Sequence, residues 1–218
     1  MIMKSEDFIV KLKELGIPVF SISTASDILQ TRAAYTRLYI SRLHRTKAIR
    51  MIEHGKYCIS GTDPYTVASR IIQQSYITGY AALRHYGLTT QIPFKLQVIA
   101  SRYHKPIKLD NYTVEFSKVK KDFVYGYTLA NNGPAFADPE KIFVDDIYLH
   151  GVQFYTEEFE YAVEDGRIDV AKLEEYAVMS GSKALIKKIT KYLKKYGIDT
   201  RLSRSHVAQR RKVIFRRH

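Results

Sequence analysis

The chain has 218 residues, of which 45% are hydrophobic and 26% are charged, a composition typical of globular rather than disordered proteins. No apolar run approaches the length of a membrane-spanning helix, and the polar, mixed-charge start from Met1 to Asp7 argues against a secretory signal, so we expect a cytoplasmic protein. The single cysteine, Cys58, excludes an internal disulfide and a zinc site built from cysteines.

The formal net charge of +13 favours a polyanionic partner, most often a nucleic acid. Residues 1–62 carry ten basic and five acidic side chains, and residues 201–218 carry seven basic and no acidic ones, whereas the chain between them is nearly balanced. A basic surface that only aids solubility would be spread more evenly. The sequence therefore predicts two separate regions that contact a polyanion.

The first thirty residues predict two helices and one extended segment. Ser5 is a good N-cap for the first helix, which continues with apolar residues at helical spacing. The apolar stretch Ile17–Ile22 contains a proline and indicates an edge strand or an extended linker. Ser23 or Thr24 can cap a second, short helix over Ala25–Gln30.

A third helix is predicted over Arg32–Arg45, with two different faces at 100° per residue. The face that we expect to be buried carries Tyr35, Tyr39, Ile40 and Leu43. The opposite face carries Ala33, Ala34, Arg37 and Ser41. Small residues let a helix lie deep in the DNA major groove, an arginine can bind guanine with two hydrogen bonds, and a serine can bond a base edge or a phosphate.

A β-hairpin follows, from Ala48–Ile52 to Lys56–Ile59, with its turn at His54 and Gly55. Three helices followed by a hairpin with a basic tip are typical of a winged helix-turn-helix DNA-binding domain. Bases would then be approached by Ala33, Ala34, Arg37 and Ser41, and phosphates by Arg32, Arg42, Arg45, Lys47, Arg50, His54 and Lys56. The alternatives are that this segment is an interaction module and that Arg37 is an ordinary solvated cation.

The rest of the chain predicts a mixed α/β domain beyond a turn at residues 61–64. The pattern indicates helices over Pro64–Gln73 and from Thr78 to Gly87, then strands and finally helices from Glu157 to about Tyr196. The predicted strands are Phe94–Ile99, Tyr112–Phe116, Tyr125–Leu129 and Ile142–Val144. The expected fold class is thus mixed α/β: a winged helix-turn-helix domain over residues 1–62, a C-terminal α/β domain over 63–200 and a basic tail over 201–218.

A second basic surface is predicted near the C-terminus. The helix Ser182–Tyr196 gathers Lys187, Lys188, Lys191, Lys194 and Lys195 on the face opposite its apolar residues. The tail adds Arg201, Arg204, Arg210, Arg211, Lys212, Arg216 and Arg217, either as a flexible arm that raises DNA affinity or as a segment ordered along the body. For the helix, a solvated amphipathic face is the favoured alternative.

The acidic residues do not indicate an enzyme. Asp145 and Asp146 would point to opposite faces of a strand, and Glu157 and Glu158 open a predicted helix, where acidic residues favour the helix dipole. The pair Glu140–Lys141 suggests a structural ion pair or a cap. With no glycine-rich phosphate loop and no pair of histidines at metal-ligand spacing, we expect no catalytic residue, no metal and no cofactor.

Over residues 6–200 the chain resembles the AbiEi-type antitoxins, the DNA-binding partners in abortive-infection (type IV) toxin–antitoxin operons. The resemblance rests on Arg37–Leu43, Gly55–Tyr57, Ser75–Ile77, Ala81–Leu83, Tyr86–Pro93 and Ala137–Lys141. The segments Tyr86–Pro93 and Ala137–Lys141 are its most specific parts. One departure affects the hairpin: where the family pattern has a glycine before the apolar pair Ala48–Ile49, this sequence has Lys47.

The resemblance implies a repressor that binds inverted repeats in its operon's promoter, as a homodimer if two copies bind, and that autoregulates by occluding the promoter. It also implies a C-terminal α/β domain that carries the antitoxin activity against a nucleotidyltransferase-like toxin, without a stable complex of the two proteins. Two other functions stay open: a non-enzymatic module that sequesters a toxin or viral factor directly, and an RNA-binding protein.

Overall fold

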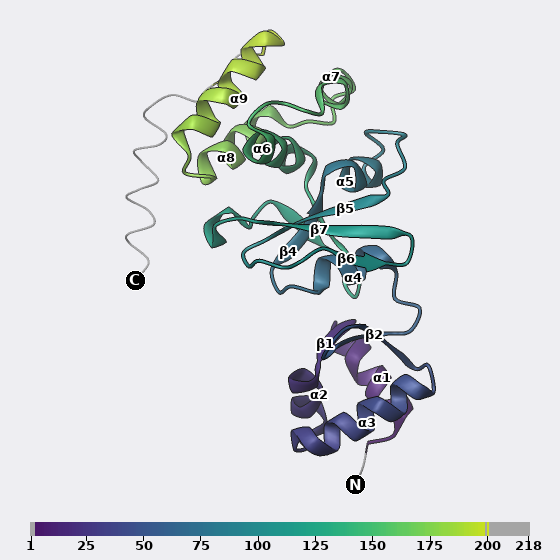
Figure 1. The fold of residues 1–218 in the computed structure, drawn as a ribbon. Coiled ribbons are helices and arrows are strands. Elements are labelled where there is room, and N and C mark those ends of the chain that lie inside the picture. Colours follow the sequence, from purple (N-terminus) through teal and green to yellow (C-terminus); the bar gives the residue numbers. More distant parts are fainter. Residues whose placement is uncertain (1–2, 199, 201–218) are drawn as a thin grey trace. The chain divides into compact units, whose positions relative to one another are not determined.

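The computed structural model describes residues 3–198 and 200 as a mixed α/β protein with two β-sheets (Figure 1). The chain divides into two compact units. Unit 1 takes the described residues up to Ile77, together with Phe94–Lys118 and Leu129–Phe136. Unit 2 takes Thr78–Pro93, Val119–Thr128 and the described residues from Ala137 onward. Residues 1–62, expected as a domain of their own, are thus grouped in unit 1 with a large part of the second sheet.

Residues 3–60 form three helices and a three-stranded antiparallel sheet (Figure 1). In chain order these elements are α1 (Ser5–Glu14), β1 (Val19–Ser21), α2 (Ile22–Leu29), α3 (Ala33–Arg45), β2 (Ile49–Glu53) and β3 (Lys56–Ile59). The strand order is β1-β3-β2, with Val19 opposite Cys58 and Ile49 opposite Ile59. The predicted edge strand and hairpin are both confirmed.

Two predicted helix caps are wrong by one to three residues. The first helix begins at Ser5 itself, so Lys4 occupies the N-cap position, and its side chain forms no capping hydrogen bond. The second helix begins at Ile22 rather than Ala25, and the cap is Ser21, whose hydroxyl oxygen accepts the backbone N–H of Thr24 at 3.1 Å. Ser21 caps a helix that starts three residues earlier than predicted, and this segment, rich in serine and threonine, offers several residues able to act as caps.

The core of this segment is aromatic and aliphatic. Phe8 is completely buried, and its ring packs edge-on against both Phe20 and Tyr39, with centroids 5.7 and 5.5 Å apart. Ile40 and Leu43 complete the buried face of α3. These contacts fix which face of α3 is left for solvent.

The second sheet has six strands in the order β6-β7-β5-β4-β9-β8. The strands are β4 (Ser75–Thr78), β5 (Lys95–Ala100), β6 (Ile107–Leu109), β7 (Tyr112–Lys118), β8 (Tyr127–Leu129) and β9 (Ala135–Ala137). The helix α4 (Pro64–Arg70) precedes them, and a 3-10 turn covers Lys121–Phe123. The pairs β5–β7 and β4–β9 are parallel, whereas β6–β7 is antiparallel.

The predicted strands at Phe94–Ile99 and Tyr112–Phe116 correspond to β5 and β7, and the one at Tyr125–Leu129 corresponds to the shorter β8. The strand β4 was not expected. All four of its residues are buried, so it lacks the polar–apolar alternation by which a half-buried strand is recognised.

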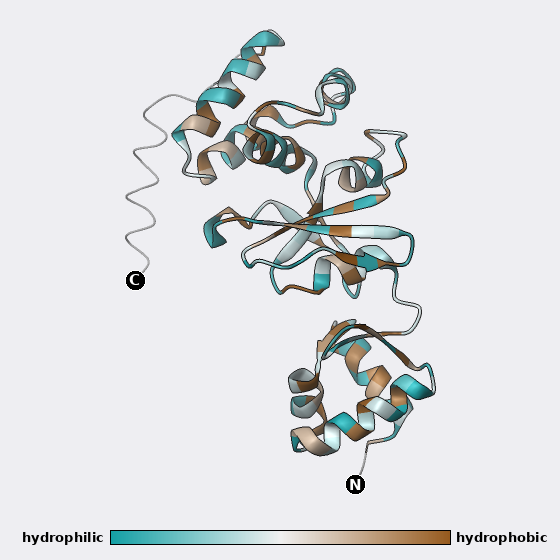
Figure 2. Cartoon of the chain, in the orientation of Figure 1, coloured by the Kyte–Doolittle hydropathy of each residue, from teal (hydrophilic) through white to brown (hydrophobic). Residues whose placement is uncertain are grey.

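Five helices belong to the described part of unit 2. They are α5 (Gly79–His85), α6 (Pro139–His150), α7 (Thr156–Glu164), α8 (Val170–Met179) and α9 (Lys183–Lys195). The helices α6, α8 and α9 pack against one another and bury Phe143, Leu173 and Ile189 between them. Figure 2 shows hydrophilic and hydrophobic stretches alternating along α9, as an amphipathic helix requires.

The predicted strand at Ile142–Val144 is wrong, because these residues lie inside α6. The helix starts with Pro139 in its first turn, directly after Asp138, and ends where Gly151 adopts a left-handed conformation with φ of 76°. Eight of its twelve residues are buried. An apolar run buried on all sides shows neither the helical nor the strand period, so the sequence pattern could not distinguish the two.

Candidate nucleic-acid interface

The helix α3 is held in place by one buried face and one buried hydroxyl. Thr36, with no exposed surface, bonds through its Oγ1 to Ser26 Oγ at 2.9 Å and to Thr31 Oγ1 at 3.0 Å. The Tyr39 hydroxyl donates to the carbonyl oxygen of Lys4 at 3.1 Å. These bonds tie α3 to α2 and to the start of α1, so the orientation of its other face is fixed.

The solvent face of α3 carries the residues that the sequence predicted to approach bases. Ala33, Ala34, Arg37 and Ser41 are all exposed. Arg32, Arg42, Arg45 and Lys47 are exposed beside them. Between Asp27 and Glu53 the sequence contains no acidic residue and six lysines and arginines. The face therefore offers small side chains at its middle and positive charge around them.

The exposed cations of α3 and of the turn that follows it differ from those of the hairpin in their partners. Within the described residues, no ion pair engages Arg37, Arg42 or Lys47. Arg50 and Lys56 of the hairpin, by contrast, are half-buried and already bonded inside unit 1. Only His54, at the hairpin tip, is as exposed as the α3 cations.

The hairpin cations bond to the loop between β6 and β7 and to the segment between α4 and β4. The Arg50 guanidinium donates to the Asp110 carboxylate at 2.5 Å. Partial burial alone would lower the pKa of Arg50, but this carboxylate holds the pKa above its ordinary value. The Lys56 ammonium donates to the carbonyl oxygen of Ile71 at 3.0 Å and pairs with Glu53 at 3.0 Å. To bind phosphate, Arg50 and Lys56 would have to exchange these partners.

A histidine adds a third link. His104 Nε2 lies 3.1 Å from the Glu53 carboxylate, and its ring packs against Phe116 with centroids 4.6 Å apart. Burial alone would raise the pKa of Glu53, but the hydrogen bonds from Lys56 and His104 hold it below its ordinary value. Nothing in the sequence pattern indicated that Asp110 or His104 would meet the hairpin, because both come more than fifty residues after the hairpin residues that they meet.

Lys47 stands at the position where the family pattern has a glycine, and it adopts a left-handed conformation with φ of 59°. Its N–H donates to the carbonyl oxygen of His44 at 3.1 Å, and the next N–H, of Ala48, donates to Leu43 at 3.0 Å. These two bonds form the Schellman motif that ends α3. The turn into the hairpin therefore keeps the glycine-type geometry with a cation in its place.

The predicted second basic surface lies on α9. Lys187, Lys188, Lys191, Lys194 and Lys195 are all exposed, while Leu185, Ile189 and Leu193 on the other face are buried. No ion pair involves these five lysines within the described residues, although Lys195 also lies 5.1 Å from the centroid of the Tyr196 ring. The tail arginines Arg201, Arg204, Arg210, Arg211, Arg216 and Arg217, with Lys212, lie outside the described residues.

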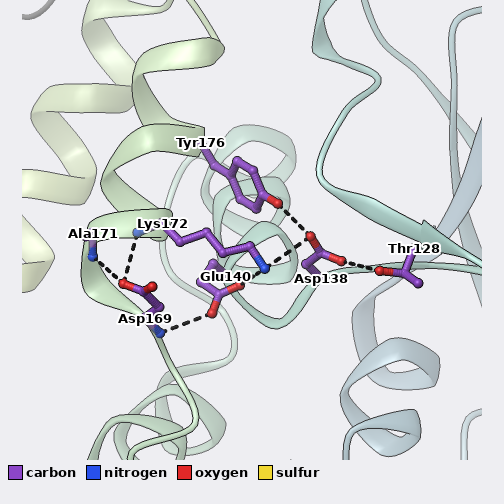
Figure 3. A network of polar contacts seen from close by, with 7 residues as sticks. All are labelled: Thr128, Asp138, Glu140, Asp169, Ala171, Lys172 and Tyr176. Carbon is purple, nitrogen blue, oxygen red and sulfur yellow. Dashed lines mark hydrogen bonds and ion pairs between the residues drawn. The ribbon is translucent and has the colours of Figure 1, made fainter.

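A network of polar contacts in unit 2 surrounds Asp138 (Figure 3). Its carboxylate accepts the Tyr176 hydroxyl at 2.5 Å and the Thr128 hydroxyl at 2.9 Å, and it pairs with Lys172 at 3.3 Å. Burial alone would raise the pKa of Asp138, but these donors hold it below its ordinary value. Each oxygen of the Asp138 carboxylate is occupied by a protein donor, so the cluster links the start of α6 to α8 rather than presenting a free acid.

The other acidic residues of α6 are also engaged within the protein. Glu140 pairs with Lys172 at 3.1 Å, and Lys141 pairs with Asp145. Both residues thus form structural ion pairs, one of the two roles expected for them, with partners on α8 and α6. Asp146 accepts the N–H groups of Phe154 and Tyr155 and bonds His150 at 2.7 Å. The prediction that Asp145 and Asp146 point to opposite faces of a strand is wrong, because both lie in α6; they bond different partners there.

Three further observations on the described residues concern metal ligands, membrane-spanning helices and the single cysteine. Residues 3–198 and 200 contain no group of three histidine, cysteine, aspartate or glutamate side chains that could hold a metal ion. In the same residues no helix combines the length and the apolar character needed to cross a membrane. Cys58 is buried in β3, and burial raises the pKa of its thiol although Arg50 opposes this, so the thiol is protonated at neutral pH.

Comparison of the sequence with known protein families finds no family that matches, and no curated protein matches it either. The candidate site therefore rests on its geometry and charge.

The left-handed Lys47 gives a stability prediction. Lys47→Gly should raise the free energy of unfolding by about 1 kcal/mol, because a side chain at positive φ is strained and glycine is not. The neighbouring Thr46, with φ of −81°, is the matched control, and Thr46→Gly should lower stability. Urea unfolding of both variants tests this, and a loss of stability in Lys47→Gly would contradict it.

The Asp138 cluster gives a pH prediction. Because the pKa of Asp138 is lowered in the folded state, its ionised form stabilises the fold above about pH 5, and this stabilisation is lost as the pH falls through the folded pKa. Asp138→Asn should lower the free energy of unfolding by about 1–3 kcal/mol at neutral pH. The gap between wild type and variant should narrow as the solution is acidified.

Asp165→Asn is the control for this measurement, because Asp165 pairs with Arg167 at the surface and exposed pairs contribute at most about 1 kcal/mol. The measurement is the free energy of unfolding in urea, at neutral and at acidic pH, for wild type and the two variants. A gap between wild type and Asp138→Asn that does not change with pH would show that the charge of Asp138 is not what stabilises unit 2.

Proposed function

We propose that this protein binds double-stranded DNA in a sequence-specific way and acts as a transcriptional repressor. The observation that carries the proposal is the exposed face of α3, where small residues and Arg37 are surrounded by cations that no described carboxylate neutralises. The element order, three helices followed by the β2–β3 hairpin, supports a winged helix-turn-helix domain in which α3 is the recognition helix.

The chemistry of the face suits a B-form major groove, which admits an α-helix and displays a different donor and acceptor pattern for each base pair. Ala33 and Ala34 allow close approach, Arg37 offers two parallel hydrogen bonds to a guanine, and Ser41 can bond a base edge or a phosphate. Arg32, Arg42, Arg45 and Lys47 would hold the phosphates on either side. An RNA duplex has a deep, narrow major groove that this face could not enter.

The resemblance to the AbiEi-type antitoxins supports a narrower proposal. The DNA target would be the inverted repeats of the protein's own promoter, bound by two copies, and repression would follow from occlusion of the promoter. Unit 2 would then contribute to the antitoxin role against a nucleotidyltransferase-like toxin. The engaged acidic residues around Asp138 and Lys141 accord with a role for unit 2 that does not require a free carboxylate.

The test is binding of the full chain to a labelled duplex of the gene's own upstream region, compared with a scrambled duplex, across a salt series. We expect a preference for the upstream duplex that persists at about 200 mM salt, because base contacts are less sensitive to salt than phosphate contacts. Equal affinity for both duplexes that collapses with salt would overturn the proposal. A stable complex with RNA or with a protein partner, without DNA, would overturn it as well.

Two variants separate base reading from phosphate binding. Arg37→Ala should weaken binding to the preferred duplex by about 1–3 kcal/mol while leaving the scrambled duplex nearly unchanged. Lys47→Gln should weaken both duplexes alike and should lower the slope of log affinity against log salt by about one. The measurement is the same salt series on each variant. Unchanged binding of Arg37→Ala to both sequences would show that α3 is not the reading helix.

A further inference from the structure

One residue of the α3 face has no role among those that the sequence predicted. Leu38 is 63% exposed, more than any other large hydrophobic residue of residues 3–62. At 100° per residue it lies on the same face as Ala34 one turn before it and Ser41 and Arg45 after it. An aliphatic side chain therefore stands at the centre of the exposed face, away from the core that Ile40 and Leu43 complete.

The surroundings of Leu38 argue against a surface for a protein partner. A single exposed leucine carries little information by itself, and protein-docking surfaces are contiguous apolar patches. Of the four positions one turn away from Leu38, Ala34 is small, Ser41 is hydroxylated and Arg42 is cationic. The fourth, Tyr35, is half-buried and packs against the core, so it adds no exposed apolar patch to the leucine. A ligand that suits this face must combine negative charge at its edges with one small apolar group at its centre.

The DNA major groove offers one such group. Thymine presents a C5-methyl group there, and the other three bases present hydrogen-bond donors and acceptors instead. We propose that Leu38 recognises a thymine through this methyl group, adjacent to the base that Arg37 contacts. This inference rests on the proposed function and adds to it a base identity that the hydrogen-bonding residues do not supply.

Deoxyuridine provides the test, because it differs from thymidine only by the missing C5-methyl group and keeps every hydrogen-bonding atom. Each thymine of the bound upstream duplex is replaced by deoxyuridine in turn, and the affinity of the full chain is measured. We expect one position in each half-site at which wild type loses about fourfold in affinity, because the contact that buries the thymine methyl group is lost there. The same replacement should leave the affinity of Leu38→Ala unchanged.

Leu15→Ala is the matched control, since Leu15 is also an exposed leucine of the same segment but lies at the end of α1, outside α3. It should respond to deoxyuridine as wild type does. Thermal unfolding confirms that both variants are folded, which is expected because neither leucine is in the core.

The outcomes that overturn the inference differ from those that overturn the proposed function. If the upstream duplex is preferred but no deoxyuridine position affects wild type, Leu38 does not read a methyl group and the repressor proposal stands. The inference also fails if Leu38→Ala loses affinity while still responding to deoxyuridine, or if this variant changes only the oligomeric state. If no duplex is preferred at all, the proposed function itself has failed.

Discussion

The arrangement of α3 depends on the packing of Phe8 between Phe20 and Tyr39. With Tyr39, Ile40 and Leu43 held in that core, and the Thr36 hydroxyl bonded to Ser26 and Thr31, the helix can present only its remaining surface to solvent. An α-helix is rigid over this length, so the directions of all the exposed side chains follow from the buried ones. The candidate interface is in this sense a consequence of the core beneath it.

The division of α3 into two faces could be predicted from the sequence because its buried residues keep the helical period. The hairpin and the strands β5 and β7 could be predicted for the same reason, since each shows its own period. The α6 helix and β4 could not, because the burial of eight of the twelve α6 residues and of all four β4 residues removes the alternation on which such predictions depend. The wrongly predicted strand at Ile142–Val144 is therefore an effect of burial and not of an unusual sequence.

The candidate site was predictable in composition but not in its internal bonds. The sequence indicated that Arg37 and Lys47 would be exposed, and they are. It gave Arg50 and Lys56 the same role as the other cations, yet both are bonded within unit 1, to Asp110 and to the Ile71 carbonyl. Such contacts join segments distant in the chain, and no local pattern records them. Leu38 carries neither a charge nor a hydrogen-bonding group, and an isolated exposed leucine does not by itself indicate a binding residue.

The bond between Arg50 and Asp110 has a thermodynamic consequence for any anion that approaches the hairpin. A phosphate can bind the Arg50 guanidinium fully only by displacing the Asp110 carboxylate, so the two anions compete for one cation. Competition of this kind is reciprocal. Neutralising Asp110 increases the affinity of Arg50 for phosphate, and phosphate binding at Arg50 weakens the bond to Asp110 by the same factor. The loop between β6 and β7 and the hairpin thus form one linked equilibrium, in which a charge change on the loop alters the electrostatics of the hairpin.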